Sequence, residues 1–581
     1  MYIKDKIINT LRDHVWAFTL SVLVGFVMVF PQVITVVNLG EEYNGIYIMK
    51  MDAEEHYLAR MQEFLDFRSL NNPFLFEGKG LSPSSSFTIS ESLLSLPLVF
   101  GVGSVPSVNL IYKFILPIIL CLAFYFLMFR ITQDKLWSLG FSITTILGYT
   151  VLTSSGIKDI LFFNFQNFPA NMYARPVNPA FSSIFFVGYL HLLLSVFRKP
   201  SNKLSVALAL FLGFSFYIYF YTFTFFIAIN VVCFILFLLC KRNRDAFGIV
   251  AAMIAGILIG SLAIINLVKL LLHENYVYLA PISNVVNSRT PVFSVLGVLV
   301  LVIFGIYMFF KWREKGVNEY FLTSTLLTAF VVINQQVITG ISVQEGHYHW
   351  YFNTPIYIMV LFWVGHKLFE KRYKFLYLSI PIIFIVLSFI VSISGQYNFY
   401  NDWSSQVFKE QRYANVFQWL NENSEKNDVV LANNELSLKI PAYTTTDVSW
   451  NYFTLAYLTP VDRTKYALFL YLRLNGVKPT DIKNESYFHP PVVNKPETKN
   501  NRGYEYEEVN ILLRDYMTGI YPDGMKKMYE DFYNKPWEEI FGMYKLDYLV
   551  WDQMMNPNWS FNEHLFEQVY TGVDLVIYKV K

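Results

Sequence analysis

Long apolar stretches with very few charges dominate the first two thirds of this 581-residue chain. About 20 consecutive apolar residues cross a hydrocarbon core of ~30 Å as a helix, so stretches of this kind limit what the chain can fold into. Charged residues make up only 15% of the sequence, against about 25% in ordinary soluble domains. We expect a polytopic α-helical membrane protein with about 11 transmembrane helices. The predicted spans lie near 16–37, 109–130, 136–154, 181–197, 204–219, 221–240, 246–270, 293–311, 319–339, 353–369 and 374–394.

The charge balance and the cysteines exclude several classes of function. The chain has 46 Lys and Arg against 44 Asp and Glu, a balance that argues against a nucleic-acid partner. Its three cysteines (Cys121, Cys233 and Cys240) all fall within apolar stretches. The water-exposed parts therefore hold no disulfide framework and no cysteine-based zinc site.

Basic residues indicate which way the chain crosses the membrane. Every second connection is short and basic, whereas the alternate connections are longer and carry few basic residues. Cytoplasmic loops are the ones enriched in Lys and Arg, so we expect a cytoplasmic N-terminus on an uncleaved first helix and a multi-pass protein of the plasma membrane. The connections predicted to face outside are 38–108, 155–180, 271–292 and 340–352.

The composition changes near residue 395 to that of a globular domain. We therefore predict a membrane domain over 1–394 and an extracytoplasmic soluble domain over 395–581. Strand-like runs at 429–432, 548–551 and 575–578 alternate with helical patterns at 406–420, 465–474, 504–517 and 525–542. This alternation is typical of an α/β fold. A Pro-, Lys- and Asn-rich stretch at 490–502 predicts a surface loop.

The long first outer loop, 38–108, contains the most suggestive pattern. The segment from Met51 to Leu65 predicts a helix at the membrane surface, on which Asp52, His56 and Arg60 recur at every fourth residue and share one face. A carboxylate and an imidazole on one face can bind a metal or deprotonate a hydroxyl, while the guanidinium holds a phosphate. The alternative is a solvated helix face with ordinary ion pairs.

Two other outer loops carry charges that could join this face. The loop after the third span contains Asp159, Lys158 and Arg175, and the loop before the eighth span contains Arg289. Isolated charges at this depth are commonly interfacial anchors, which is the alternative to a functional role.

The loop between the ninth and tenth spans is the densest in polar groups. Glu345, His347 and His349 follow one another within five residues and are wrapped by aromatic side chains. A His-x-His pair beside a Glu can ligate a metal or bind phosphate, although two such ligands do not complete a site. The alternative is an aromatic interfacial belt with solvated histidines. No phosphate-binding loop, dinucleotide turn or nucleophile elbow occurs in the sequence, so we place any chemistry at the outer face.

The layout and these motifs resemble the GT-C superfamily of membrane glycosyltransferases, which includes oligosaccharyltransferases, protein O-mannosyltransferases and aminoarabinose transferases. The family's essential acid in the first outer loop corresponds to Asp52, and its second acid after the third span to Asp159. Ser342-Val-Gln-Glu345 fits the S-V-x-E motif of oligosaccharyltransferases. Those enzymes have about thirteen spans and a W-W-D motif in the soluble domain, whereas this chain has Trp450-Asn-Tyr.

The resemblance implies a transferase that moves a sugar from a polyprenyl-phosphate donor to an acceptor at the outer face, with inversion. It implies catalytic roles for Asp52, Asp159 and Glu345, which are also the candidate ligands of a divalent metal (Mg or Mn). A transporter or flippase of a lipid-linked or polar solute, and an inactive GT-C-like scaffold, stay open as alternatives. The expected phosphate-binding residues are His56, Arg60, Arg175, Arg289, His347 and His349.

Overall fold

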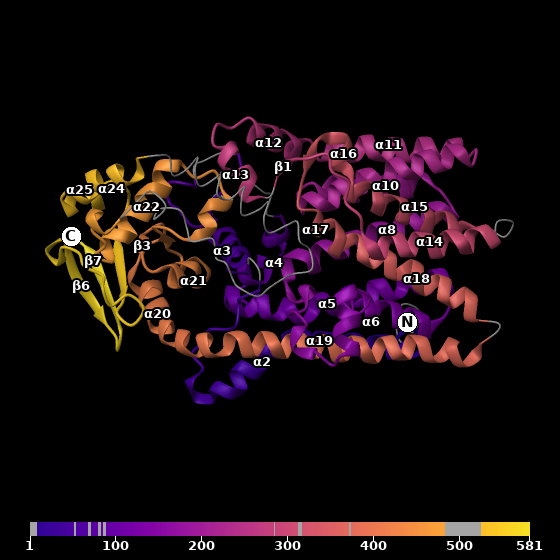
Figure 1. Cartoon of the computed structure of the whole chain (residues 1–581), viewed down its shortest axis with the longest axis horizontal. Coiled ribbons are helices and arrows are strands. Elements are labelled where there is room, and N and C mark those ends of the chain that lie inside the picture. The colour runs from indigo at the N-terminus through magenta and orange to yellow at the C-terminus, as the bar shows by residue number, and fades with distance from the viewer. Residues whose placement is uncertain are drawn as a thin grey trace.

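The computed structural model describes residues 9–51, 54–67, 71–79, 83–84, 89–283, 285–311, 316–370, 373–482 and 524–581. The chain forms a long helical bundle with a smaller domain at one end that contains a β-sheet (Figure 1). The first long helix begins at the end of the bundle that is remote from this C-terminal domain. The predicted class, a polytopic helical membrane protein with a C-terminal α/β domain, is confirmed.

Helices occur at each of the predicted spans. Among the described residues, five helices are long and apolar enough to cross a membrane, or six if one bent pair counts as a single span. The predicted number of eleven is therefore not confirmed, because several helices are shorter than a bilayer requires. The bundle helices are α2 (Val15–Leu39), α5 (Val105–Thr132), α6 (Lys135–Leu147), α8 (Ser182–Arg198), α9 (Asn202–Ser215), α10 (Phe220–Leu239), α11 (Asn243–Ile259), α12 (Ser261–Leu271), α14 (Val295–Phe310), α15 (Val317–Ile333), α18 (Thr354–Phe369) and α19 (Lys374–Glu410).

Local sequence explains where these helices begin and bend. Asp134 caps α6 by accepting a hydrogen bond from the Trp137 amide at 2.9 Å, and Ser294 caps α14 through the Gly297 amide at 3.1 Å. The predicted span 246–270 is divided into α11 and α12, which are bent by 62°. Gly260 and Ser261 lie at this break, and Gly/Ser pairs are a common cause of sharp kinks.

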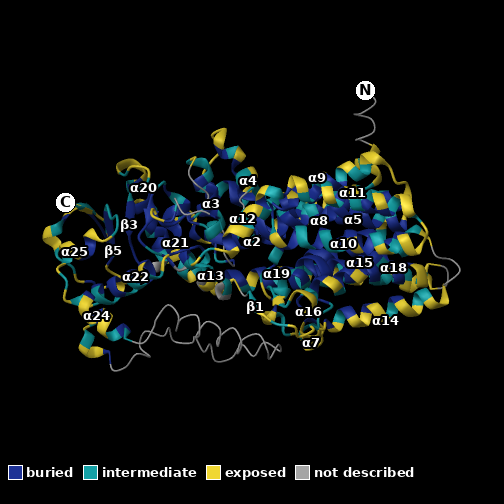
Figure 2. Ribbon diagram, turned by 90° about the horizontal axis from the view of Figure 1, so that it is seen from above, coloured by how far each residue is buried: buried dark blue, intermediate teal, exposed yellow. Residues whose placement is uncertain are grey.

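The outward surface of the bundle is apolar. Exposed residues line the outer side of α14 (Figure 2), and they include Val295, Val302 and Phe309. Such side chains would be unfavourable in water over so large an area, whereas lipid accepts them. The molecule is therefore a multi-pass membrane protein.

Short elements form the connections at the end of the bundle next to the C-terminal domain. They are η1 (Gly40–Glu42), α3 (Glu54–Leu65), α4 (Ile89–Val99), α7 (Ser154–Leu161), η2 (Phe165–Asn167), η3 (Met172–Ala174), η4 (Pro176–Phe181), α13 (Tyr276–Ile282), α16 (Gln335–Thr339), α17 (Glu345–Tyr348), η6 (His349–Asn353) and the two-stranded sheet of β1 (Val286–Asn287) and β2 (Ile341–Ser342).

The C-terminal domain is a mixed five-stranded sheet with helices. The strand order is β4-β3-β5-β7-β6, in which β4, β3 and β5 are parallel and β5, β7 and β6 are antiparallel. Its elements are η7 (Gln411–Tyr413), α20 (Ala414–Asn423), β3 (Val429–Leu431), α21 (Asn434–Tyr443), β4 (Asp447–Val448), η8 (Tyr452–Ala456), α22 (Val461–Leu474), η9 (Pro479–Asp481), α24 (Met525–Tyr533), α25 (Trp537–Gly542), β5 (Tyr548–Asp552), η11 (Glu563–Leu565), β6 (Phe566–Thr571) and β7 (Leu575–Val580).

The three predicted strands are confirmed as β3, β5 and β7, whereas β4 and β6 were not predicted. The helical pattern at 525–542 is divided into α24 and α25, with Pro536 directly before the second helix. The domain boundary predicted at 394/395 falls inside α19, which continues for 37 residues without a break. The predicted helix at 504–517 and loop at 490–502 lie outside the described residues.

Candidate functional site

Helix α3 is the central element of the outer end. Asp52, the residue predicted to be the essential acid, lies outside the described residues, and α3 begins two positions later at Glu54. The predicted helix is confirmed, but it does not lie free on a surface. It packs on the connecting helix α4, on α5 of the bundle and on α21 of the C-terminal domain, so charged side chains on several of its faces are buried.

Glu54 attaches α3 to the bundle. Its carboxylate lies 2.6 Å from Nζ of Lys113, a residue of α5, and the two side chains are 2% and 1% exposed. The same carboxylate oxygen accepts a hydrogen bond from Nδ2 of Asn109 at 2.8 Å. A buried pair of this kind is stable only while both charges are present. The pair therefore fixes the start of α3 against α5.

Glu55 faces the opposite partner, the C-terminal domain. Its carboxylate lies 3.7 Å from Nζ of Lys439 on α21 and 3.8 Å from Nζ of Lys50. Both lysines also approach Glu410 at the end of α19, at 3.3 Å and 3.5 Å. Burial raises the pKa of Glu55, and the two lysines partly offset that effect. Farther along α3, Lys79 bridges Glu63 at 2.7 Å and Asp447 at 2.6 Å.

His56 and Arg60, predicted to share a face with Asp52, both have partners in the structure. A ring nitrogen of His56, Nε2, shares a hydrogen bond with the hydroxyl of Tyr457. Burial, aided by the nearby positive charge of Arg60, lowers the pKa of His56 to about 3. Its imidazole is thus neutral at physiological pH. Arg60 is 3.2 Å from the buried carboxylate of Glu91 on α4.

A second polar group forms where the outer loops meet. Arg175, only 7% exposed, donates a hydrogen bond from Nη2 to the hydroxyl of Tyr351 at 2.5 Å. The ring of Tyr351 stacks on that of His347, with centroids 5.2 Å apart. His347 in turn shares a 2.5 Å hydrogen bond between Nδ1 and the hydroxyl of Tyr219. Two of the predicted residues, from loops 172 positions apart in sequence, are thereby brought together.

Tyr57 links this group to α3. Burial raises the pKa of Tyr57 to about 12, and the charge of Arg175 together with a hydrogen bond from Asn178 partly opposes the rise. We call Tyr57, Arg175, Tyr219, His347 and Tyr351 the outer arginine cluster. Its members come from α3, the turn before η4, the residue that precedes α10 and the α17–η6 segment. It combines a buried cation, an imidazole and three hydroxyls, a set able to bind a phosphate.

Four other predicted residues lie elsewhere in the outer loops. Arg289 donates from Nη1 to the carbonyl oxygens of Val337 and Ile338 at 2.9 Å and 3.2 Å. It thereby provides hydrogen-bond donors for carbonyl groups at the C-terminal end of α16. Asp159 on α7 accepts a hydrogen bond from Asn167 at 2.8 Å. Glu345 is the first residue of α17, two positions before His347. The ring of His349 meets that of Trp350 edge-on at 4.6 Å.

The predicted metal site includes Asp52, which lies outside the described residues, so this site stays a prediction. Within it, no three His, Cys, Asp or Glu side chains are grouped so that they could hold a metal ion. Asp159 lies on α7 beside η2, whereas Glu345 begins α17 beside α10 and α15. We derive no step of the reaction through a metal ion.

Several residues of this region were not predicted. Glu54 and Glu55 lie two and three positions after Asp52, and Lys113 is a charge inside the otherwise apolar span 109–130. A charge within a span is costly and usually has a partner or a function, so Lys113 was the available signal. No pattern in the sequence distinguished the tyrosines of the outer arginine cluster from the others, because the chain has 40 tyrosines.

No protein-family model matches the chain, and no curated protein matches it. The structure is similar to that of the Archaeoglobus fulgidus oligosaccharyltransferase in its apo form, with a TM-score of 0.46 and 11% identity over 93% of this chain and 70% of that chain. The form tethered to an acceptor peptide with the NVT sequon gives a TM-score of 0.46 and 12% identity over 94% and 70%. Similarity at this level assigns no activity to the chain.

Proposed function

We propose that the chain is a membrane glycosyltransferase that moves a sugar from a polyprenyl-phosphate-linked donor to an acceptor at the outer face. The observation that carries this proposal is the outer arginine cluster. Arg175 and His347 meet around Tyr351, next to Tyr57 of the helix that follows Asp52. A buried guanidinium beside an imidazole suits a phosphate that gains negative charge as it leaves.

Asp52, Arg175 and His347 have separate roles in this reaction. The acceptor oxygen attacks the anomeric carbon, and the bond from that carbon to the phosphate oxygen breaks. The proton of the acceptor goes to the carboxylate of Asp52, which acts as the general base. Arg175 and His347 stabilise the released lipid phosphate. A single displacement inverts the configuration at the anomeric carbon.

The orientation of the chain supports this placement. The C-terminal domain and the start of α2 lie at opposite ends of the bundle (Figure 1). The short connections at the end remote from that domain are the basic ones, such as 198–203 and 241–244. By the distribution of Lys and Arg, that end faces the cytoplasm. The outer arginine cluster then faces the side on which lipid-linked sugars replace nucleotide sugars as donors.

The test is sugar transfer by the purified protein in lipid, with a panel of polyprenyl-phosphate sugars as donors. We expect Asp52→Asn to abolish transfer and slow donor hydrolysis. We expect Arg175→Gln to lower kcat/KM by about 10²–10³-fold, the usual loss when a charge-stabilising donor is removed. Lys158→Gln is the matched control, because it removes an outer cation that is exposed and lies on α7.

Normal turnover by Asp52→Asn would show that the base is wrongly assigned. Saturable binding of the lipid phosphate without turnover by any donor, unchanged in Asp52→Asn, would favour a transporter or an inactive scaffold. An equal loss in Lys158→Gln and Arg175→Gln would show that general surface charge, not the outer arginine cluster, accounts for the effect.

A further inference from the structure

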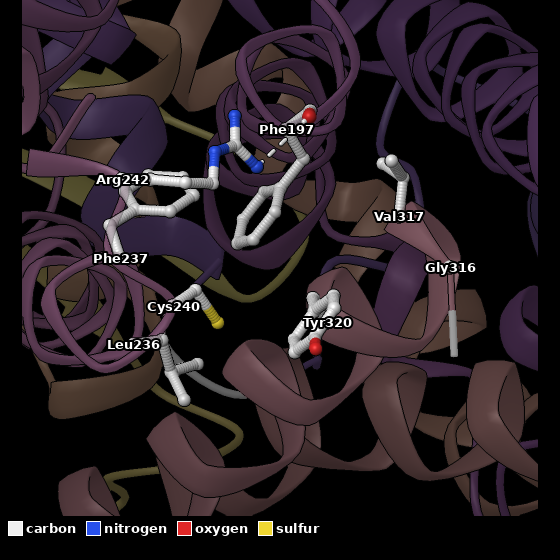
Figure 3. A pocket seen from close by; sticks show the side chains of 8 residues that line it. All are labelled: Phe197, Leu236, Phe237, Cys240, Arg242, Gly316, Val317 and Tyr320. Carbon is white, nitrogen blue, oxygen red and sulfur yellow. Dashed lines mark hydrogen bonds between the residues drawn. The ribbon is translucent and has the colours of Figure 1, made fainter. Parts of the chain in front are cut away.

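A pocket lies at the end of the bundle remote from the C-terminal domain. It has a volume of about 220 Å³ and is formed between the ends of α8 and α10 and the start of α15. Figure 3 shows the rings of Phe197, Phe237 and Tyr320 and the sulfur of Cys240 around a common space. Phe197 and Phe237 are buried and form its floor, whereas Cys240 and Gly316 are exposed at its mouth. The pocket is thus open to the surroundings and apolar inside.

Arg242 lies at the edge of this pocket. Its guanidinium is 4.6 Å from the ring centroid of Phe237 and donates from Nη1 to the carbonyl oxygen of Phe197 at 3.3 Å (Figure 3). Its Nε is paired with Asp245 at 2.7 Å. Among the described residues, Nη2 of Arg242 has no hydrogen-bond partner, which leaves a donor for an anion.

The surroundings of the pocket are positively charged. Arg198, Lys241 and Arg244, which are sequence neighbours of lining residues, are all exposed. With Arg242 they make four cations, against Asp245 and Glu319, the latter of which accepts a hydrogen bond from the Gly316 amide. Arg198 also bridges to Asn318 at 3.3 Å, so its charge is held beside the start of α15.

We infer that this pocket binds an anionic phospholipid, with the phosphate at Arg242 and the first part of one acyl chain on the aromatic floor. The volume is below the roughly 300–1,000 Å³ of pockets for drug-sized ligands, but one chain segment needs less. The position at helix ends is the depth of lipid headgroups, where basic residues attract anionic lipids. A free phosphate would use the cations but would leave the apolar floor uncovered.

Native mass spectrometry of the delipidated full-length protein tests this site. The probes are phosphatidylglycerol and phosphatidylcholine with identical acyl chains, each titrated into the detergent-solubilised protein. We expect one tightly held phosphatidylglycerol and at least tenfold weaker phosphatidylcholine. Arg242→Gln should weaken phosphatidylglycerol about tenfold, the equivalent of one charge-assisted contact. Arg242→Lys should recover most of the affinity.

Two further variants separate the parts of the site. Cys240→Phe fills the exposed mouth and should displace the lipid although every charge remains. Lys374→Gln removes an exposed cation at the same end of the bundle, on α19, whose main packing among the described residues is on α2, α6 and α18. It should leave binding unchanged. Glycerol phosphate, a headgroup without chains, should not compete.

Equal binding of the two phospholipids would overturn the inference, and so would equal losses in Lys374→Gln and Arg242→Gln. Displacement by glycerol phosphate would show a plain anion site instead. Unchanged binding in Cys240→Phe would place the lipid elsewhere. None of these outcomes depends on whether the outer face transfers sugar, because the readout is lipid bound to the protein.

Discussion

The ion pair between Glu54 and Lys113 offers the most direct test of how α3 is held. The perturbation is Lys113→Met, which keeps an unbranched side chain one heavy atom shorter but removes its charge. The Glu54 carboxylate, 2% exposed and 2.6 Å from Nζ in the wild type, would then keep the hydrogen bond from Asn109 but lose its counter-charge. Stranding a buried charge costs about 3–5 kcal/mol. The variant should therefore lose about this much of its free energy of unfolding.

The double variant Glu54→Gln/Lys113→Met separates the charge from the packing. With both charges gone, no ion is left buried, and we expect stability within about 1–2 kcal/mol of the wild type. Unfolding would be followed by tryptophan fluorescence in mixed micelles as a denaturing detergent is added. Lys545→Met is the control, because Lys545 and Asp547 form a partly exposed pair at 3.4 Å, with side chains 34% and 29% exposed. A solvent-accessible pair of this kind is worth about 0–1 kcal/mol.

Two results would refute this reasoning. If Lys113→Met costs no more stability than the Lys545→Met control, the Glu54–Lys113 pair is not desolvated as its burial indicates. If the double variant is no more stable than Lys113→Met, the lost packing of the lysine chain, and not the stranded carboxylate, explains the cost.

Two other predictions concern α3 and α19. The pKa of His56 is about 3 in the folded protein, against 6.5 in the unfolded chain. Between these pH values only the unfolded state binds the proton, so the free energy of unfolding should rise with pH by up to about 1.4 kcal/mol per unit. The thermal midpoint of His56→Gln should depend less on pH across this range. Gly395→Ala on α19 would place a Cβ 2.1 Å from the carbonyl oxygen of Pro169 and should lower the free energy of unfolding by about 1–3 kcal/mol. Gly305→Ala is the control, because its Cβ would have no neighbour within 4 Å. It should raise the free energy of unfolding by about 0.5–1 kcal/mol in the same melting assay.

Much of the fold could be predicted because hydrophobic patterns are local. The apolar runs give the bundle helices, and the short buried runs of β3, β5 and β7 give most of the sheet. Strand β4 has only two residues, and β6 alternates too weakly, as its exposed Glu567 and Gln568 show. Both are strands because their neighbours pair with them, which is information that a local pattern does not contain.

The candidate site could be predicted only in part, because its contacts join distant segments. Arg175 and His347 were identified from their loops, but their meeting depends on Tyr351 and Tyr219. His56 and Arg60 were identified as a face that could bind phosphate, and the structure gives them Tyr457 and Glu91 as partners. Helical spacing shows which side chains share a face and not what that face meets.

Lys439 joins the two domains at α3, and its removal should have a pH-dependent cost. It is fully buried between Glu55 and Glu410, at 3.7 Å and 3.3 Å. Burial already raises the pKa of Glu55 above 4.5, and Lys439 is the largest opposing influence. In Lys439→Met that pKa should rise further. The folded state then binds a proton that the unfolded state has released, so stability falls as pH rises from about 4.5 to the new folded pKa.

The Lys439→Met variant should therefore be closer to the wild type at pH 5 than at pH 8, measured as the difference in thermal midpoint. Adding Glu55→Gln should remove most of this pH dependence, since the carboxylate that responds is gone. A penalty in Lys439→Met that is equal at both pH values would mean that the lysine acts through packing alone. In that case the charges between α3, α19 and α21 would not be what holds the C-terminal domain on the helix that follows Asp52.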